Sequence, residues 1–426
     1  MHVLLCAHAH QPTTGRSTPA KPGRVTNGPV FMTPSPPVPT ISLAAVDDRR
    51  SSRALQSAVE QALLGPGWFL VPLSDLEDGH SCIHDAYSAA DAWSAEPEEA
   101  RARCEQDAAA ETGCLGLTYL PLGKEPLYQA KATQRVRSLN AHAPLSAEQC
   151  DALLPADMPA DEREIAHQYH RWPTEPPASR AVRTASVALV QRLRERVCEP
   201  LFKLLEQLLG LGLGALARRC AMRRSDNTSL LRLLEYPPAA SQEDGGGHGS
   251  GGECGSDGDG DGSWGVSEHT DFELFSLIHQ ASPGLQLRDR GGAWHTVAAA
   301  GYGEDAALVV LVGDMLERLS AGYFTATAHR VLATAAGAVS RRSLVYFVAL
   351  DEEERISALP AASVRRGSGL AEWLEGLPEA KRRRYATPIT QREWTEMQEG
   401  RAREQLADAS STGPAAGADD LDVLVS

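Results

Sequence analysis

Apolar residues recur at helical intervals in the first half of the chain. Leu55, Val59 and Leu63 stand four residues apart and predict a helix over 53–63, which GPG ends before the strand-like run WFLV. The alanine-rich residues 84–110 predict a further helix. A long apolar stripe predicts another over 180–209, kinked at Pro200 and closed by Gly210. Helices mixed with a short strand indicate an α/β region at the N-terminal end.

After residue 229 the pattern changes to that of β-strands. Short β-prone runs follow one another: LLRLLEY, HTDFELFSLI, GLQLR, WHTVA, ALVVLV, FTATAHRVLA and SLVYFVAL. RDRGG, between the third and the fourth run, predicts a hairpin turn. Several short strands in sequence favour a β-sandwich or a jelly roll, so the whole chain is predicted to be an α+β protein.

Composition marks the segments that do not fit into a core. Residues 1–37 are rich in Pro, Ser, Thr and Gly and predict a disordered tail or, because no acidic residue precedes Asp47, an organelle transit peptide. Residues 239–262 contain ten glycines and six acidic residues and predict a flexible insert between two strands. The expected organisation is therefore an N-terminal region over 38–180, a β-rich domain over 181–400 and a second disordered tail over 401–426.

Charge and cysteine content exclude several classes of protein. Acidic residues outnumber basic ones 56 to 41, which argues against nucleic acid as a partner, and Lys381–Arg384 is interpreted as a solvated helix face. No apolar run approaches the roughly 20 residues that a membrane span needs. The eight cysteines lack a CxxC pair, so we expect a reducing compartment: the cytoplasm, or a plastid or mitochondrion if the tail is a transit peptide. We expect a monomer that acts on a small molecule.

A candidate metal site begins in the run HTDFELFSLI. If this run is one strand, His269 and Asp271 point to the same face, because side chains two residues apart in a strand do so. A His-x-Asp triplet alone occurs roughly once by chance in such a chain, and two ligands do not make a tight site. The best third ligand is His329 in FTATAHRVLA. Two histidines and one carboxylate suit Fe(II) and leave three positions open.

A candidate anion site follows in SRRSLVYFV. Arg341 and Ser343 are again two residues apart, and a guanidinium with a hydroxyl on one face recognises a carboxylate. Arg342 points to the opposite face and is predicted to lie at the surface.

A second metal pattern lies in the insert. Asp257, Asp259, Asp261, Gly262 and Glu268 match the spacing of a calcium-binding EF-hand loop. That loop needs an amphipathic helix on each side, whereas here a glycine tract precedes it and a strand follows. We therefore interpret it as a flexible loop.

Taken together, these motifs resemble the iron(II)- and 2-oxoglutarate-dependent dioxygenases, in the branch that includes isopenicillin N synthase. PGLQLRDRGGAWHTV, GDMLERLSAGYFTATAHRV and LRLLEYPP are similar to characteristic segments of that family, as are VPTISL, GWFLV and WPTEPP further upstream. The resemblance covers roughly residues 38–400 and is most specific over 230–350. It implies a double-stranded β-helix (jelly roll) core with supporting helices.

The resemblance also implies roles for single residues. His269, Asp271 and His329 would bind Fe(II). The distal carboxylate of 2-oxoglutarate would be held by Arg341 and Ser343, with a hydrogen bond from Tyr236. The keto-acid end would chelate the iron beside the position for dioxygen, and turnover would hydroxylate or desaturate a small organic molecule with release of succinate and CO₂.

Several points stay open at this level. Leu234 stands where many relatives have an asparagine, and Ser42 stands where an aspartate is common, which weakens any inference about the substrate. Glu273 is either turned towards the pocket or directed outward by an irregularity in the strand. One alternative is an iron oxidase that does not use 2-oxoglutarate, like isopenicillin N synthase or the ethylene-forming oxidase of plants. Another is a catalytically silent module that binds a small molecule.

Overall fold

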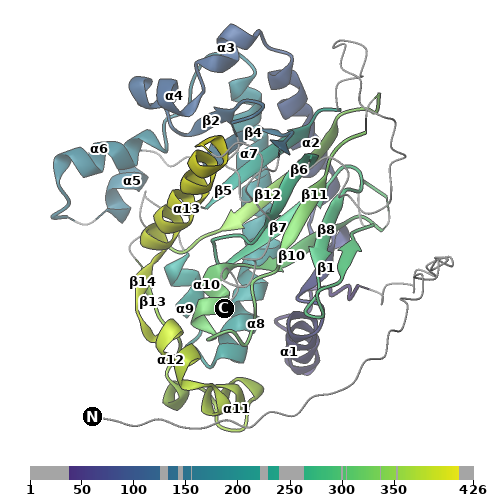
Figure 1. The fold of residues 1–426 in the computed structure, drawn as a ribbon, viewed down its shortest axis with the longest axis vertical. Helices are drawn as coiled ribbons and strands as arrows, with labels where there is room; N and C mark the ends of the chain where they lie inside the picture. The colour runs from purple at the N-terminus through teal and green to yellow at the C-terminus, as the bar shows by residue number, and fades with distance from the viewer. Residues whose placement is uncertain are drawn as a thin grey trace, which may run out of the picture. The chain divides into compact units, whose positions relative to one another are not determined.

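The chain forms two β-sheets with a core between them, and helices pack on the outer face of the larger sheet (Figure 1). The computed structural model describes residues 38–124, 133–142, 147–154, 156–220, 229–238, 263–298, 301–303, 305–335, 337–351 and 354–411. The predicted N-terminal tail and the Gly-rich insert 239–262 lie outside the described residues.

The larger sheet has seven strands and the smaller sheet has five. The larger one runs in the order β1 (Trp68–Pro72), β10 (Ala307–Val312), β7 (Phe275–Gln280), β12 (Arg341–Val348), β5 (Leu230–Tyr236), β4 (Arg137–His142) and β2 (Leu117–Leu120). The smaller one runs in the order β3 (Thr133–Gln134), β6 (Ser263–His269), β11 (His329–Leu332), β8 (Leu285–Arg288) and β9 (Trp294–Thr296). A separate pair joins β13 (Arg355–Ile356) to β14 (Ile389–Thr390). Strands from both predicted regions, 38–180 and 181–400, thus share one sheet.

Alternating side chains of the central strands face two different cores. In β12, Val345 packs in the core between the sheets, whereas Leu344 and Tyr346 pack in the core under the helices. In β5, Leu234 packs in the core between the sheets and Leu233 packs in the core under the helices. A strand buried on both faces reads as a nearly continuous apolar run, and this is why the sequence located β5, β10 and β12 well. The sandwich with helices on one face confirms the predicted α+β fold with a jelly-roll core.

The described residues include thirteen α-helices. They are α1 (Arg49–Leu64), α2 (Gly79–Ser94), α3 (Glu98–Ala102), α4 (Gln106–Thr112), α5 (Ala147–Leu153), α6 (Ala160–Gln168), α7 (Ser179–Leu193), α8 (Glu199–Leu209), α9 (Ala215–Arg219), α10 (Asp314–Leu319), α11 (Gly369–Gly376), α12 (Glu379–Ala386) and α13 (Gln391–Ser411). Helix α13 extends to Ser411, inside the segment 401–426 that was predicted to be a tail.

Proline explains two departures from the predicted helices. The helix predicted over 84–110 is divided, because Pro97 starts the separate helix α3. The break expected at Pro200 is a π-helical turn, Arg194–Cys198, between α7 and α8. Pro200 has no N–H to donate to the carbonyl one turn earlier, so the regular α-helical pattern is interrupted just before it. Gly210 closes α8 with a φ of 69°, as predicted.

The run HTDFELFSLI is not one strand, which corrects the sequence interpretation. β6 ends at His269 in the smaller sheet, and β7 begins at Phe275 in the larger one. The intervening residues cross from one sheet to the other. Their backbone bonds to the start of α10, where Asp314 N donates to Asp271 O (2.9 Å) and Met315 N to Glu273 O (3.1 Å). Just before β7, Leu274 N donates to Val348 O at the end of β12 (3.0 Å). Strand β11 is likewise shorter than FTATAHRVLA, because it starts at His329.

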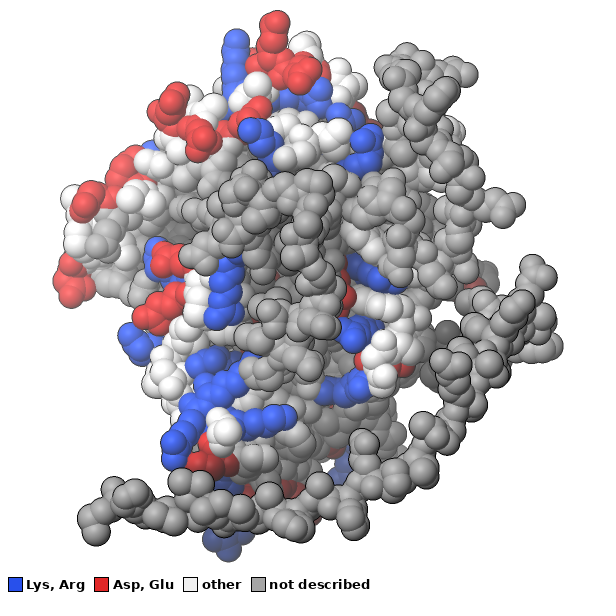
Figure 2. Space-filling model, viewed as in Figure 1, with Lys and Arg blue, Asp and Glu red and all other residues white. Residues whose placement is uncertain are grey.

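Two surface features predicted from the sequence, a hairpin turn and an exposed basic run, are present in the structure. Asp289 N donates to Ala293 O and closes the predicted RDRGG hairpin between β8 and β9. On the face in Figure 2, basic side chains gather over α12, where Lys381–Arg384 is exposed as predicted. Within the described part of the chain, no helix combines the length and the apolar character needed to cross a membrane.

A buried carboxylate joins α8 to α9. Glu206 is 1% exposed and accepts hydrogen bonds from Gly214 N (2.6 Å) and Leu216 N (2.8 Å) at the start of α9. We expect Glu206→Gln to lower the free energy of unfolding by about 1–3 kcal/mol, because an amide replaces an ionised acceptor of buried N–H groups. Urea unfolding followed by circular dichroism measures this change. An unchanged midpoint would show that the carboxylate adds nothing to stability.

Candidate metal centre

Two histidines meet at the ends of paired strands. His269 closes β6, His329 opens β11, and the two residues are directly paired in the ladder, with ring centroids 4.2 Å apart. His269 Nδ1 lies 2.8 Å from Ser267 O, and His329 Nδ1 lies 3.0 Å from Thr327 O. A carbonyl oxygen only accepts, so each Nδ1 must carry the proton and donate it. Both rings therefore present an Nε2 lone pair to the interior.

A carboxylate reaches the same point from the segment that crosses between the sheets. Asp271 is 5% exposed, and its Oδ1 lies 3.7 Å from His269 Nε2 and 3.6 Å from His329 Nε2. Gly313 lets this segment approach the start of α10, because a Cβ at that position would lie 2.2 Å from Glu273 O. Asp271 thus reaches the histidines through a crossover, and not through the single strand that the sequence predicted.

These three side chains can hold a metal ion. One ligand atom from each of His269, Asp271 and His329 lies within 4.8 Å of the others. The separations of 3.6–3.7 Å are too long for hydrogen bonds, and Asp271 Oδ2 is buried with no hydrogen-bond partner within the described ranges. Burial, together with the neighbouring His329, lowers the pKa of His269 to about 3, so its imidazole is neutral as ligation requires. The donor set and its burial fit Fe(II).

A second polar group lies in the same interior. Arg341 and Ser343 in β12 are 6% and 3% exposed, and both face the space between the sheets. Tyr236, at the end of β5, bonds through its hydroxyl to Ser343 Oγ (3.1 Å). The centroid of its ring lies 4.7 Å from the Arg341 guanidinium carbon. Arg341 Nη1 is buried and has no hydrogen-bond partner among the residues that the structure describes. A carboxylate is the ligand that such a guanidinium and hydroxyl pair accepts best.

The residues that hold Arg341 in place were missed by the sequence reasoning. Its Nη2 donates to Gln280 Oε1 (2.7 Å), and its Nε donates to Ser282 O (3.0 Å). Gln280 is fully buried, and its Nε2 donates to Val297 O (2.9 Å), so the orientation of the amide is fixed. Gly284 leaves room for the guanidinium, because a Cβ there would lie 2.5 Å from Arg341 Nε. In the sequence, the signal that could have revealed this contact is a polar residue, Gln280, at the end of an apolar strand.

The metal-ligand cluster and the pair Arg341 and Ser343 line one cavity of about 230 Å³. Its apolar walls come from both sheets and include Val266, Ile278, Leu285, Val331, Val345 and Phe347. Glu273 also lines the cavity, which answers the question of its direction, and burial and the Asp271 carboxylate raise its pKa to about 8. Thr395 and Glu399 of α13 complete the lining, a contribution from the C-terminal helix that the sequence did not indicate.

Of the calcium-like pattern, the structure describes Glu268. Asp257, Asp259, Asp261 and Gly262 lie outside the described residues. Glu268 is on β6 and forms an ion pair with Arg288 Nη1 (3.0 Å).

A β-sandwich that brings two histidines and one carboxylate together in its interior has the ligand set typical of non-haem iron oxygenases. Residues 228–349 match the family model of the 2OG-Fe(II) oxygenase superfamily. The donor set of the site is compatible with the Fe(II) that this family's name specifies.

Relatives of known sequence and structure agree with this assignment. The chain is 32% identical over 195 residues to gibberellin 2-beta-dioxygenase 2 of Oryza sativa subsp. japonica, an alignment that covers 44% of this chain and 50% of that protein. It thus spans about half the length of this curated relative. A 2OG-Fe(II) oxygenase family protein from Caulobacter crescentus superposes with a TM-score of 0.57 at 22% identity, over 86% of this chain and 99% of that one. The rice dioxygenase for auxin oxidation gives 0.53 at 19% identity, over 85% and 95%. Both structures show the shared fold.

Metal binding can be measured directly. We expect the protein to bind one Mn(II), a redox-stable stand-in for Fe(II), with the signal of free Mn(II) in electron paramagnetic resonance as the readout. Asp271→Ala should weaken binding by more than the roughly 10–100-fold that loss of an outer-shell partner causes, because it removes a ligand. Asp289→Ala, which removes a carboxylate of the β8–β9 hairpin, is the control. Equal affinities of Asp271→Ala and the unaltered protein would place the metal elsewhere.

Proposed function

We propose that this protein is an Fe(II)- and 2-oxoglutarate-dependent dioxygenase that hydroxylates or desaturates a small organic molecule, with release of succinate and CO₂. Fe(II) is held by His269, Asp271 and His329. The distal carboxylate of 2-oxoglutarate is held by Arg341 and Ser343, with Tyr236 alongside.

One observation carries the proposal: the metal-ligand cluster and a buried arginine with an unused donor line the same cavity. His269, Asp271 and His329 supply the metal ligands there, and Arg341 presents Nη1 to the same space. A dicarboxylic acid that bridges a metal ion and a guanidinium matches this pair of groups. The family match over residues 228–349 supports the same interpretation.

The side chains of this protein bind, orient and exclude water. The hydrogen bonds from the two Nδ1 atoms hold His269 and His329 with Nε2 towards the metal position. Gln280 and the Tyr236 ring hold the guanidinium of Arg341 in one plane, so that the co-substrate is bound in one orientation. Apolar walls keep bulk water away from the reacting groups. Bound Fe(II), together with 2-oxoglutarate and dioxygen, supplies the oxidising power.

The substrate is proposed at the level of its class. The cavity has mainly apolar walls with polar groups at Glu273, Thr395 and Glu399, which suits a small, largely apolar molecule that carries a polar group. The relative gibberellin 2-beta-dioxygenase 2 is named for action on a gibberellin, which supports a small-molecule substrate.

The wider setting is also a proposal. The six cysteines that the structure describes form no disulfide with one another, which supports a reducing compartment, either the cytoplasm or a plastid or mitochondrion. We further propose that the chain acts as a monomer, with 1–37 as a tail or transit peptide and the regions 38–180 and 181–400 acting together.

Anaerobic spectroscopy tests the co-substrate. Fe(II) and 2-oxoglutarate added to the protein without oxygen should give a visible charge-transfer absorption. His269→Ala should abolish it by removing a metal ligand, and Arg341→Ala should shift its half-saturation to higher 2-oxoglutarate. His295→Ala and Arg383→Ala, which change a hairpin histidine and an exposed α12 arginine, are the controls.

Succinate formation in air, measured across a panel of small metabolites, tests turnover. An iron oxidase without 2-oxoglutarate would consume oxygen and form no succinate. A binding module would do neither, and either result would contradict the proposal.

The space that Gly284 leaves for Arg341 gives a sharper test. Gly284→Ala places a methyl group against the guanidinium and should weaken 2-oxoglutarate binding by about tenfold, the effect of about 1.4 kcal/mol. Gly303→Ala is the matched control, because no atom lies within 4 Å of its Cβ position. Calorimetric titration in the presence of Mn(II) measures both. Equal dissociation constants for the two variants would show that Arg341 is not part of the 2-oxoglutarate site.

A further inference from the structure

The strand pair β5–β12 carries a second set of paired charges on the face opposite the cavity. Tyr236 is paired with Arg341 in the ladder, and the next pair along is Glu235 with Arg342. Side chains of neighbouring residues in a strand point to opposite faces, so Glu235 and Arg342 face helix α2. Arg137 of β4 is paired with Glu235 from the other side. The sequence predicted a surface position for Arg342, which is wrong because this pairing places its side chain, 21% exposed, under α2.

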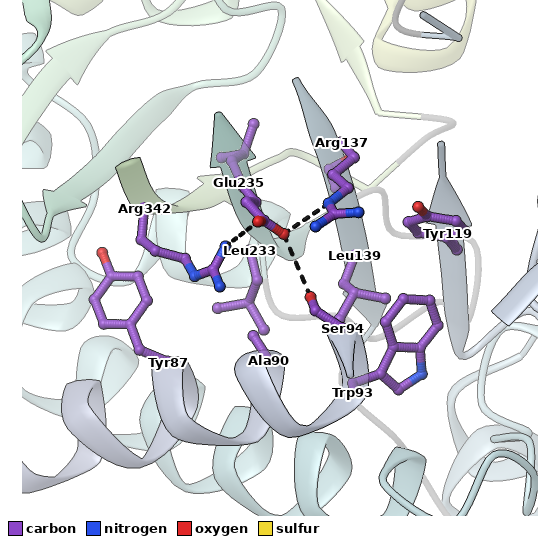
Figure 3. Close-up of a pocket in the computed structure, with 12 residues that line it drawn as sticks. Tyr87, Ala90, Trp93, Ser94, Tyr119, Arg137, Leu139, Leu233, Glu235 and Arg342 are labelled. Carbon is purple, nitrogen blue, oxygen red and sulfur yellow. Dashed lines mark hydrogen bonds and ion pairs between the residues drawn. The ribbon is translucent and has the colours of Figure 1, made fainter. Parts of the chain in front are cut away.

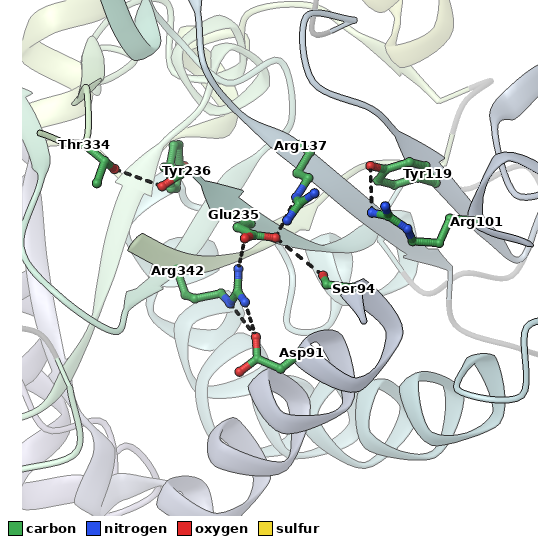
Figure 4. Close-up of polar contacts among 9 residues, drawn as sticks. All are labelled: Asp91, Ser94, Arg101, Tyr119, Arg137, Glu235, Tyr236, Thr334 and Arg342. Carbon is green, nitrogen blue, oxygen red and sulfur yellow. Dashed lines mark hydrogen bonds and ion pairs between the residues drawn. The ribbon is translucent and has the colours of Figure 1, made fainter. Parts of the chain in front are cut away.

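Glu235 forms ion pairs with both neighbouring strands (Figure 4). Its Oε2 lies 2.6 Å from Arg137 Nε and its Oε1 lies 2.9 Å from Arg342 Nη1. Arg342 continues the network to α2, since its Nε donates to Asp91 Oδ1 (2.6 Å). Burial opposes ionisation of Glu235, but the two guanidinium groups outweigh it and lower the pKa to about 2. One carboxylate thus joins β4, β5 and β12, and one arginine joins them to α2.

Packing alone does not fix the strands at this point. A cavity of about 20 Å³ lies between α2 and the sheet beside the network, lined by Ala90, Trp93, Leu139 and Leu233 (Figure 3). This is room for about one water molecule. Beside this gap, the ion pairs add a directional contact between the helix and the strand ends to the packing around them.

Helix α2 makes a second connection to the residues behind the cavity. The Tyr87 hydroxyl lies 3.0 Å from His279 Nδ1 and donates to His279 O (3.2 Å). His279 precedes Gln280, whose Oε1 accepts from Arg341. Since Ser94 of α2 donates to Glu235 Oε2 (3.5 Å), both strands next to β12, namely β5 and β7, are tied to the same helix.

We propose that Glu235 is a positioning residue for the anion pocket, so that its ion pairs with Arg137 and Arg342 set the affinity for 2-oxoglutarate from the far side of the sheet. This inference rests on the proposed function. A shift of one residue in the β5–β12 register would turn Arg341 and Ser343 out of the cavity, and a tilt would move them relative to Tyr236. Since Glu235 and Arg342 are directly opposite, their ion pair resists both movements.

The test compares two buried carboxylates. Glu235→Gln should weaken 2-oxoglutarate binding, titrated calorimetrically with Mn(II) present, by about tenfold, within the range of couplings between separate sites. Glu206→Gln removes a buried carboxylate that joins α8 to α9 and accepts hydrogen bonds from Gly214 N and Leu216 N. It should lower the melting temperature and leave the dissociation constant for 2-oxoglutarate unchanged.

A conservative variant separates positioning from general destabilisation. Arg342→Lys keeps a cation opposite Glu235 and should retain most of the affinity, whereas Arg342→Leu should lose about as much as Glu235→Gln. If the unaltered protein binds 2-oxoglutarate and all these variants bind it equally well, with only their melting temperatures changed, the network is structural alone and the inference is wrong. If the unaltered protein does not bind 2-oxoglutarate, the proposed function fails first.

Discussion

The register of β12 between β5 and β7 is the constraint on which the interior depends. Because side chains alternate along a strand, one register places Arg341 and Ser343 in the cavity and Leu344 and Tyr346 in the helix-facing core. The opposite register would bury two polar groups under helices and expose apolar ones to the cavity. Both the apolar packing and the polar site therefore favour the same alignment, and each stabilises the geometry that the other needs.

The metal ligands depend on a different constraint, the passage of the chain from one sheet to the other. His269 is fixed by its ladder pair with His329, whereas Asp271 belongs to a segment that bonds to the start of α10. Two ligands are thus held by the smaller sheet and one by the crossover. Strand pairing, a helix start and the close approach at Gly313 each fix part of the backbone that carries these ligands, which preorganises the cluster. Such preorganisation lowers the entropic cost of binding a metal.

Sequence reasoning predicted the strands well and the connections between them poorly, for a physical reason. β5, β10 and β12 are buried on both faces, so their apolar runs are local and visible. The run HTDFELFSLI looks equally apolar, but the segment after His269 bonds to the distant residue Asp314, and no local pattern encodes that contact. Gln280 and Glu235 were missed for the same reason, since their partners are on other strands. The polar residues found from sequence were those with a recognisable spacing.

The two faces of β5 and β12 also differ in how strictly their roles determine their side chains. In the cavity, Arg341 and Tyr236 must present one arrangement to a ligand, so their chemistry is narrowly determined. On the far face, a carboxylate between two guanidinium groups has only to hold three strands together. A well-packed apolar cluster would stabilise as well or better, because burying charges has a desolvation cost. What ion pairs add is direction: they favour one register, whereas apolar contacts tolerate several. Charges at this contact are therefore best explained by alignment of the strands.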